Sequence, residues 1–421
     1  MESYLTYWRR QLWLRVLDGW IGLQLIVLAY HIRFVAVASL SKINLTGDMV
    51  HYDHAATTLL SLHRFTYWNT APSAQVTPGY PLFLELMYVL TPYSGHAGQV
   101  MYGLFGQAAL SAVVAGVLYF ISRRGMGPLA AAAVGLIWAY YPPAVWSVRL
   151  LLTETLFTFM LIVYLAAWLG SIQRFGRNEW LLTGLLLGGT ALVRPTVMPL
   201  VAVPLGLWLW QRLRPAEKLR PWLQAFTWQA VGFVVVMIPW WVRNLLTLHR
   251  LILASEDAGN PLLYGSDPRF PNGPDLGAGL TAPAQTALAV HRIVNGFLHH
   301  PWIYLKWYTF DKLQLLFRQP WYPTGASGGV LLHAHLVWVV LGAMGLLLCA
   351  LDPYMRWVMW LAAFLVLVQL PFIPISRYVF PVMPLFLVGV GWLLQRLVQA
   401  ASRLFSFSIP YVTLGDGNRQ R

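Results

Sequence analysis

Charge is scarce in this sequence, and negative charge most of all. Only 10% of the 421 residues are Asp, Glu, Lys or Arg, and only 15 are acidic. Cys349 is the one cysteine, which excludes a disulfide within the chain. No HExxH or CxxC motif and no phosphate-binding glycine loop is present, which argues against a zinc or nucleotide site. Met1–Arg15 has no small-residue cleavage site, so we expect no cleaved signal peptide.

Long apolar runs occupy the sequence instead. Hydrophobic residues make up 58% of it, and the mean hydropathy is +0.57. Many runs reach the roughly 20 residues that cross a bilayer as a helix. The formal net charge of +14 lies in short loops between these runs, a pattern that suits anionic lipid headgroups and not nucleic acid. We therefore predict an all-α, multi-pass membrane protein, with its 21 Trp and 20 Tyr concentrated at the membrane interfaces.

The apolar runs predict about ten transmembrane helices in a single domain over residues 1–399, followed by a basic tail over 400–421. The expected spans are about 18–40, 97–121, 128–142, 152–170, 180–193, 196–211, 222–241, 330–350, 354–370 and 379–399. Two long loops interrupt this series, one over 41–96 and one over 242–329.

The two long loops are predicted to contain short helices of their own. In the first loop, apolar spacing predicts an amphipathic helix over Tyr52–His63. A run too short to cross the membrane predicts an interfacial helix over Leu82–Leu90. Thr77-Pro-Gly-Tyr-Pro81, between them, is expected to break any helix. The second loop is predicted to be irregular in its first half and helical over about 284–318, with a break at His299-His-Pro301.

The basic residues predict the orientation of the chain in the membrane. If every span crosses once, the short loops with several basic residues all share one side, which the positive-inside rule assigns to the cytoplasm. These residues are Arg9, Arg10, Arg15, Arg123, Arg124, Arg174, Arg177, Arg212, Arg220, Arg356, Arg396 and Arg403. We therefore predict that both termini lie in the cytoplasm. Both long loops then lie on the outer side.

Two acidic residues and two histidines stand just beyond the first predicted span. They are Asp48, His51, Asp53 and His54. Asp48 precedes the predicted amphipathic helix, so it either caps that helix or takes part in chemistry. Asp53 lies within the helix and is expected to turn toward solvent. The two imidazoles beside Asp53 leave a divalent metal ion open as a cofactor, although no metal motif supports one.

Other ionisable residues are predicted to lie on the same outer side. They are Arg149, Glu154, Arg194, Arg243, His299, His300, Lys306, Arg318 and Arg377. At a bilayer edge such groups tend to face a cavity and to pair with one another. A carboxylate there can deprotonate an attacking hydroxyl, while guanidiniums hold a phosphate. A lipid phosphate is the simplest phosphate-bearing substrate at such a position.

Several of these residues also have structural interpretations. Arg194 and Arg243 suit plain interface anchors, and Arg33, inside the first span, either snorkels to the surface or faces the site. Glu154 begins the fourth span, where the helix dipole favours a carboxylate; it and Asp53 are the candidates for a second acid. Further candidate site residues are His51, Lys306 and Arg318.

A series of short motifs over about residues 15–400 resembles a known family. In chain order they are Gly47-Asp48 with Tyr52, Thr77-Pro-Gly-Tyr-Pro-Leu-Phe83, Tyr141-Pro-Pro143, Leu152-Thr-Glu-Thr-Leu-Phe-Thr-Phe159, Gly184-Leu-Leu-Leu-Gly188, Leu192-Val-Arg-Pro-Thr196, Pro239-Trp-Trp-Val-Arg-Asn244 and Arg377-Tyr-Val-Phe-Pro-Val-Met-Pro384. Their order and spacing are similar to those of bacterial membrane glycosyltransferases of the GT-C class. That class is related to protein O-mannosyltransferases and lipid A aminoarabinose transferases. The resemblance to its bacterial members implies a location in the bacterial cytoplasmic (inner) membrane.

The resemblance implies a polyprenyl-phosphate-linked sugar donor, an inverting transfer, and a catalytic aspartate at Asp48 that acts as general base. It also implies that Arg243 and Arg377, together with Arg194, bind the donor phosphate. Many relatives carry Asp-Glu where this chain has Asp48-Met49, which leaves the metal role of a second acid open. The acceptor is left open between a lipid, a glycan and a protein.

Two other functions compete with this one. A lipid-linked glycan ligase or polymerase would also use basic residues of an outer loop, and His299, His300 and Arg318 suit that use. A flippase or transporter of a lipid-linked substrate would predict repeated halves and helices broken near the membrane midplane. The sequence shows no internal repeat, and its polar residues cluster on the predicted outer side and not at mid-membrane.

Overall fold

The computed structural model describes residues 2–91, 95–212, 220–256, 259–273, 277, 279–323 and 328–404. Across these ranges the chain is helical and contains no strand. Among the described residues, six helices are long and apolar enough to cross a membrane: Trp13–Ala38, Gly95–Ser122, Thr153–Arg174, Pro221–Leu248, Gly329–Cys349 and Ser376–Arg403. The predicted all-α, multi-pass fold is confirmed, while the number of ten crossings stays a prediction. The predicted basic tail beyond residue 404 lies outside the described residues.

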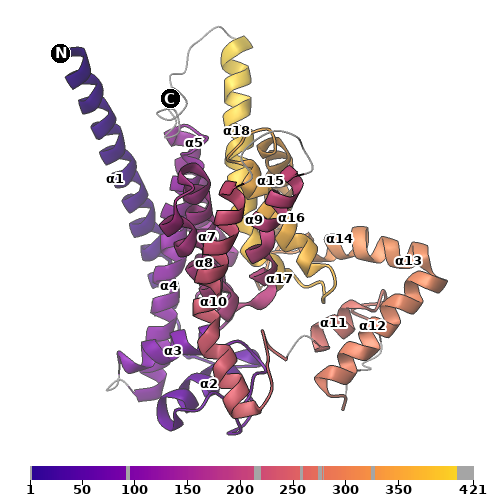
Figure 1. Ribbon diagram of the computed structural model, residues 1–421. Coiled ribbons are helices and arrows are strands. Elements are labelled where there is room, and N and C mark those ends of the chain that lie inside the picture. The colour runs from indigo at the N-terminus through magenta and orange to yellow at the C-terminus, as the bar shows by residue number, and fades with distance from the viewer. Residues whose placement is uncertain are drawn as a thin grey trace.

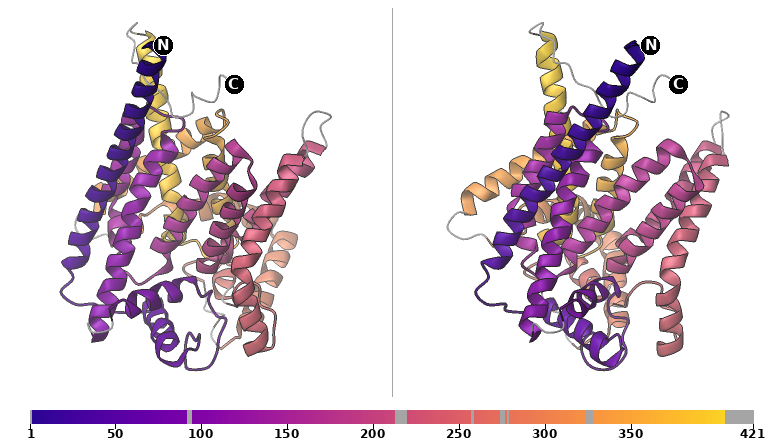
Figure 2. Two further views of the ribbon diagram at one scale, coloured as in Figure 1. Left: turned by 60° about the vertical axis from the view of Figure 1, so that its left-hand side comes forward. Right: turned by 90° about the vertical axis from the view of Figure 1, so that its left-hand side faces the viewer.

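The main helices form one bundle. They are α1 (Glu2–Ala38), α4 (Gly95–Ser122), α5 (Pro128–Tyr140), α7 (Thr153–Arg174), α8 (Arg177–Val193), α9 (Val203–Arg212), α10 (Arg220–Leu248), α15 (Gly328–Cys349), α16 (Arg356–Gln369) and α18 (Met383–Leu404). Figures 1 and 2 show them running side by side, with the start of α1 and the end of α18 at the same end of the bundle. The two long loops that the sequence predicts for the outer side lie toward the other end, and they are called the first and second outer loops after that prediction.

Prolines set the helix boundaries that position the site. α5 begins with Pro128 at its first position, where the missing N–H costs no hydrogen bond, and the short helix α6 (Pro142–Ser147) begins in the same way. α8 ends before Arg194-Pro195, because a residue that precedes proline is disfavoured in helical conformation. Arg194 is extended as a result, and the 3-10 helix η1 (Pro195–Ala202) leads from it into α9. This extended conformation leaves the side chain of Arg194 free to turn into the bundle.

Glycines allow two pairs of helices to approach closely. At Gly184 in α8 an added Cβ atom would lie 2.1 Å from the carbonyl oxygen of Gln229 in α10. At Gly345 in α15 an added Cβ would lie 1.8 Å from the carbonyl oxygen of Gly389 in α18. Small residues at such crossings are typical of helix pairs in membranes, where close backbone contact replaces the hydrophobic effect.

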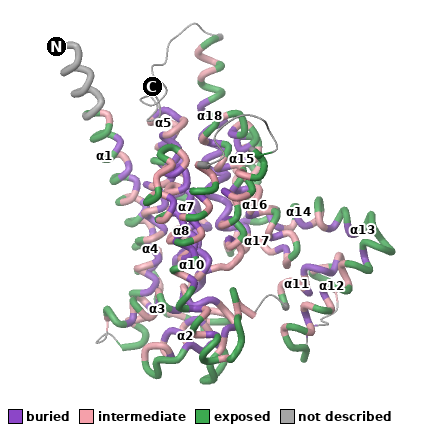
Figure 3. The backbone as a smooth tube through the Cα atoms, in the orientation of Figure 1, coloured by how far each residue is buried: buried purple, intermediate pink, exposed green. Residues whose placement is uncertain are grey.

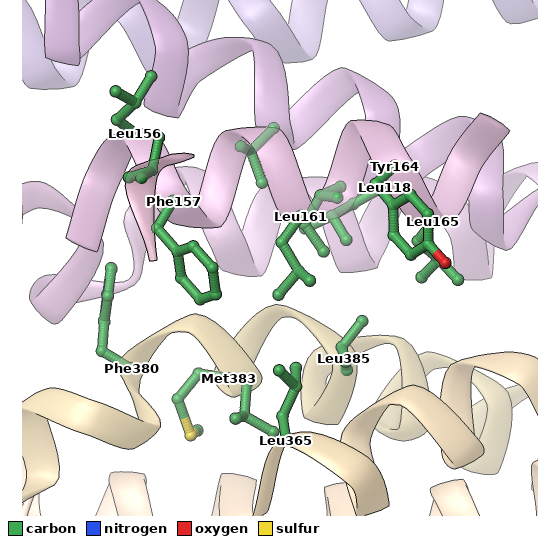
Figure 4. Close-up of a cluster of buried hydrophobic side chains, with 14 of the residues drawn as sticks. Leu118, Leu156, Phe157, Leu161, Tyr164, Leu165, Leu365, Phe380, Met383 and Leu385 are labelled. Atoms are coloured by element: carbon green, nitrogen blue, oxygen red, sulfur yellow. The ribbon is translucent and has the colours of Figure 1, made fainter. Parts of the chain in front are cut away.

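A buried apolar contact joins the middle of the chain to its C-terminal part. Figure 4 shows Leu161 and Leu165 of α7 facing Leu365 of α16 and Leu385 of α18, and all four side chains are almost fully buried. Figure 3 shows the same pattern at larger scale, with buried residues along the centre of the bundle and exposed ones on its outer faces. This contact holds the start of α7 and the start of α18 at the same level.

Arg33 departs from both of its predicted roles. It is fully buried in α1, donates Nε to Ser111 Oγ at 2.7 Å, and donates Nη1 and Nη2 to the carbonyl oxygens of Ala139 and Trp138 at 3.0 Å. The last carbonyls of a helix have no partner within that helix, and here the arginine supplies one. Arg33 therefore neither snorkels nor faces the site; it ties α1 to the end of α5.

The first outer loop forms two short helices at the end of the bundle opposite the N-terminus (Figure 1). They are α2 (Asp48–Leu62) and α3 (Gly79–Val89), close to the predicted ranges. The expected helix break at Thr77–Pro81 is wrong, because α3 begins at Gly79 and Pro81 lies in its first turn, where proline is tolerated. Gly79 packs tightly against α8: an added Cβ atom would lie only 2.6 Å from the carbonyl oxygen of Leu192, which is too close.

The second outer loop forms an arm that projects to one side of the bundle in Figure 1. Its elements are α11 (Gly259–Gly265), α12 (Ala282–His299), α13 (Pro301–Lys306), the π-helical turn η2 (Trp307–Asp311) and α14 (Lys312–Phe317). The predicted break at His299-His-Pro301 is confirmed, since α12 ends at His299 and α13 begins at Pro301. Beyond α16 the chain turns through α17 (Ser376–Val379) and η3 (Phe380–Val382) into α18.

Candidate active site

A cavity of about 230 Å³ lies where the first outer loop meets α7, the end of α8 and α17. Its polar lining includes Asp48, Thr153, Arg194, Gln369 and Arg377. These residues come from five separate parts of the sequence. Three of the ionisable residues predicted for the site therefore border one space.

Asp48 is the first residue of α2, but it does not cap the helix. Gly47 takes the N-cap position with φ 54°, in the left-handed region that glycine tolerates, and no side chain caps the helix. The Asp48 carboxylate instead accepts a hydrogen bond from Arg377 Nη1 at 2.8 Å. The capping interpretation is wrong, and the carboxylate, 45% exposed, borders the cavity.

Arg377 connects two carboxylates that are far apart in sequence. Its Nη1 donates to Asp48, and its Nε donates to Oε1 of Glu154 in a short hydrogen bond. It lies in α17, within the segment that links α16 to α18, the last helix of the bundle. The planar guanidinium suits this double contact because its N–H groups diverge in a fixed plane.

Glu154 is the buried centre of the network, with 1% of its side chain exposed. Its Oε1 accepts from both Arg377 and Arg194, while Oε2 has no hydrogen-bond partner among the described residues. A buried carboxylate is costly unless it is paired, and two guanidiniums provide that pairing. With Asp48, the four side chains balance two negative charges against two positive ones.

Arg194 is held in place from three directions besides Glu154. Its Nε donates to Thr153 Oγ1 at 2.8 Å. Its guanidinium carbon also lies 5.6 Å from the ring centre of Phe157 and 5.7 Å from that of Tyr378, within cation–π range. The interface-anchor interpretation does not describe this position, since the side chain borders the cavity and lies among protein groups.

Arg243 lies elsewhere. It donates Nη1 to the carbonyl oxygen of Ser73 and Nη2 to that of Phe65, both at 2.8 Å. Its guanidinium also lies over the rings of Phe65 and Trp240. Arg243 does not line the cavity, and its guanidinium secures the backbone of the first outer loop to α10.

Asp53 is not turned to solvent, which corrects the sequence prediction. Only 13% of its side chain is exposed. Oδ1 accepts from the Tyr88 hydroxyl at 2.6 Å, and Oδ2 lies 3.0 Å from His96 Nε2, so Asp53 joins α2 to α3 and α4. The contact arises because α3 packs back onto the face of α2 that carries Asp53.

The histidines near Asp53 point to different neighbours. The ring of His51 packs against Trp68, with centres 3.9 Å apart, and His54 Nε2 lies 3.2 Å from the carbonyl oxygen of Asn69. Within the described part of the chain, no group of three or more His, Cys, Asp or Glu side chains could hold a metal ion. The network of Asp48, Glu154 and two arginines already balances its own charge.

The other predicted site residues do not border the cavity. Lys306, Arg318, His299 and His300 are exposed on the arm, and Lys306 pairs with Asp311 at 3.4 Å. Arg149 lies over the ring of Trp146. None of the residues that suited a glycan ligase therefore lines this cavity.

Two residues near the cavity were not among the predicted site residues. Tyr52 lines it, and burial raises the pKa of the Tyr52 hydroxyl above its usual range. Lys312 is fully buried and donates to the carbonyl oxygens of Leu370 and Phe372, the latter at 2.9 Å. Both carbonyls belong to the segment between α16 and α17. Leu315 and Leu316, three and four residues after Lys312 in α14 and so on the same helix face, were the available signal of its burial.

Comparison with known proteins identifies the fold. The sequence matches no family model and no curated protein. Among solved structures, ArnT from Cupriavidus metallidurans bound to undecaprenyl phosphate is similar over 92% of this chain and 62% of that chain, with a TM-score of 0.51 and 15% identity. Oligosaccharyltransferase AglB from Archaeoglobus fulgidus, in complex with an inhibitory peptide and a dolichol-phosphate, is similar over 93% of this chain and 52% of that chain, with a TM-score of 0.56 and 12% identity.

Both of these proteins are GT-C glycosyltransferases, and the chain has a GT-C-like fold. It spans 62% of the length of ArnT and 52% of that of AglB. The similarity at these identities is one of fold, in agreement with the resemblance inferred from the motifs.

Proposed function

We propose that the protein is an integral membrane glycosyltransferase. It transfers a sugar from a polyprenyl-phosphate donor to an acceptor hydroxyl on the outer side of the membrane. The observation that carries this proposal is the network of Asp48, Arg377, Glu154 and Arg194 at one cavity. The structures of ArnT with undecaprenyl phosphate and of AglB with a dolichol-phosphate support a lipid phosphate as the ligand of this fold.

The donor phosphate binds to Arg377 and Arg194. Both guanidiniums border the cavity, and both are held at present by carboxylates of this chain. Guanidinium–phosphate hydrogen bonds are charge-assisted and can be bidentate, which suits a phosphate that must be bound away from bulk water. We leave Arg243 out of this role because backbone carbonyls already occupy its guanidinium.

Asp48 acts as the general base. Its carboxylate is partly exposed, whereas Glu154 is buried between two arginines and stays a charged support for them. When a phosphate draws Arg377 away, Asp48 Oδ2 loses its partner and can accept a proton. Donor binding and release of the base are then linked through one arginine.

The transfer is a single displacement. The acceptor oxygen attacks C1 of the sugar while Asp48 takes its proton, and the bond from C1 to the phosphate oxygen breaks. Polyprenyl phosphate leaves with the bonding electrons, and Arg377 and Arg194 stabilise its added charge. Attack opposite the leaving group inverts the anomeric carbon. The apolar cavity wall formed by Leu365, Val368 and Phe372 suits the first isoprene units of the donor.

Membranes with and without the protein, supplied with radiolabelled polyprenyl-phosphate sugars, test this function. We expect label to enter a new product only where the protein is present. Identification of that product names the sugar and shows whether the acceptor is a lipid, a glycan or a protein. Donors that remain intact with every sugar tried would refute the proposal.

A further inference from the structure

A second, larger cavity lies toward the other end of the bundle. Its volume is about 660 Å³, and α7, α9, α10 and α16 contribute its walls. The lining is almost wholly apolar and rich in aromatic rings, including Trp168, Trp222, Trp357 and Trp360. Trp360 and Trp210, another lining residue, are more than half exposed, so the crevice opens sideways from the bundle.

A positively charged side chain lies at one end of this crevice. Among the described residues that line the crevice, only Arg356 is charged. It is exposed, begins α16, and lies over the ring of Trp357. Phe364, on the same helix, lines the crevice about 12 Å deeper at the rise of an α-helix. The crevice therefore has a cationic mouth and an apolar interior.

One buried donor of the crevice wall has no hydrogen-bond partner within the described chain. It is Nε1 of Trp168, whose ring lies 5.3 Å from that of Trp357. A buried donor without a partner is uncommon in proteins. An acceptor oxygen of a ligand in the crevice would satisfy the Trp168 indole.

We propose that this crevice binds an anionic phospholipid. The acyl chains fill the apolar interior, the headgroup phosphate meets Arg356, and an ester oxygen accepts from the Trp168 indole. An apolar crevice with a single cation at its membrane-surface end suits a lipid with an anionic headgroup better than one with a zwitterionic headgroup. The site is separate from the proposed active site, and its occupation does not depend on sugar transfer.

Equilibrium binding of radiolabelled phosphatidylglycerol and phosphatidylcholine to delipidated protein in neutral detergent tests the site without any donor. Wild-type protein should prefer phosphatidylglycerol about fivefold, the ratio expected for one arginine near an anionic lipid. Arg356→Gln should abolish the preference. Leu207→Trp, which fills the crevice, should lower binding of both lipids in protein shown by gel filtration to be folded.

Arg396→Gln is the matched control, because Arg396 is also exposed and lies over a tryptophan, Trp392, but does not line the crevice. Its lipid preference should equal that of wild type. Equal binding of both lipids by wild type, or an unchanged preference in Arg356→Gln, overturns the proposal. Displacement of phosphatidylglycerol, molecule for molecule, by polyprenyl phosphate also overturns it and assigns the crevice to the donor's tail.

Discussion

At the scale of single residues, the first prediction concerns the general-base role proposed for Asp48. Asp48→Asn keeps an oxygen that can accept from Arg377 but removes the ability to take a proton. We expect the variant to fold with an unchanged melting temperature and to lose roughly 10²- to 10⁴-fold in transfer rate. Turnover of a labelled donor by purified protein measures this. A fully active Asp48→Asn protein would remove the general base from the mechanism.

Asp53→Asn is the matched control for that variant. The substitution weakens the contacts with Tyr88 and His96, which join three helices of the outer end. It should therefore lower the melting temperature while the transfer rate per folded molecule stays close to that of wild type. Loss of transfer in a folded Asp53→Asn protein would make Asp53 the better candidate for the base.

Arg377 gives a second prediction at this scale. Arg377→Lys keeps the charge beside Glu154 but lacks the planar group that reaches two partners. We expect KM for the donor to rise about 10- to 100-fold, the equivalent of about 1.5–3 kcal/mol for a lost charge-assisted hydrogen bond. Steady-state kinetics with donor varied at saturating acceptor is the measurement.

Arg243→Lys should leave the KM for donor within about twofold of wild type, since Arg243 contacts carbonyls of the first outer loop and not the cavity. A rise confined to Arg243→Lys would place the phosphate beside Arg243 instead. The two variants make the same chemical change, so a general effect of replacing arginine with lysine is removed by the comparison.

The sequence indicated the residue types of the site better than their partners. Asp48, Glu154, Arg194 and Arg377 lie in separate motifs, and the structure brings all four together. Arg243 also lies in a motif on the predicted outer side, yet irregular backbone at Ser73 and Phe65 satisfies its guanidinium. Acceptors of that kind follow from the path of a loop, which residue spacing does not predict.

At the scale of elements, Lys312 controls the connection from α16 to α17. Burial lowers the pKa of Lys312 from 10.5 to about 7. Below about pH 7 both folded and unfolded chains hold the proton, and the full cost of burying the charge applies. Above it the folded chain loses the proton first, so stability should rise between about pH 7 and 10.5.

We therefore expect the melting temperature of wild type, relative to Lys312→Met, to rise from pH 7 to pH 10. Release of the Leu370–Phe372 segment in Lys312→Met should also raise the KM for donor, because Arg377 follows it directly. Lys306→Met, on the exposed part of the same arm, is the control and should change neither quantity. An identical pH profile for wild type and Lys312→Met would contradict this role.

The contact between α8 and α10 supplies a further prediction at this scale. Gly184→Ala would place Cβ 2.1 Å from the carbonyl oxygen of Gln229, so the helices must separate. We expect a loss of about 1–3 kcal/mol of stability from this overpacking. Gly206→Ala in α9 is the control, because an added Cβ there meets no atom within 4 Å. Equal melting temperatures for the two variants in the same detergent would show that the contact is not close.

Element boundaries followed from the sequence where proline or an apolar run decided them. The ends of α5 and α8 and the break before α13 are such cases. The start of α3 was missed because proline is tolerated in a first turn, which a rule for helix interiors does not consider. Lys306 and Lys312 lie one and a half helical turns apart, and only the packing of the arm against α16 decides which of them is buried.

At the scale of the whole molecule, orientation is the open prediction. In a Cys349→Ser background, cysteines at Thr70 and Asn272, both exposed in the outer loops, should react with an impermeant thiol reagent from outside intact cells. A cysteine at Glu217, a position outside the described residues, should react only after the membrane is opened. Labelling of Glu217 from outside would reverse the orientation and move the proposed site to the cytoplasm.

Composition alone was sufficient to predict a multi-pass helical membrane protein, because few acids and long apolar runs are incompatible with a soluble core. The GT-C-like fold needed the order of several motifs, and similarity to ArnT and AglB supports it. The number of crossings did not follow, since α8, α9 and α16 are shorter than a full span and can cross only with the help of their neighbours.

The most direct test of the central claim is the fate of the donor in vesicles that contain the purified protein. Polyprenyl phosphate labelled in its lipid part, carrying a sugar with a second label, is supplied with an acceptor extract. We predict that wild type releases one polyprenyl phosphate for each sugar transferred, with inverted anomeric configuration, and that Asp48→Asn releases almost none. Intact donor that crosses the bilayer without losing its sugar would contradict the account and indicate a transporter.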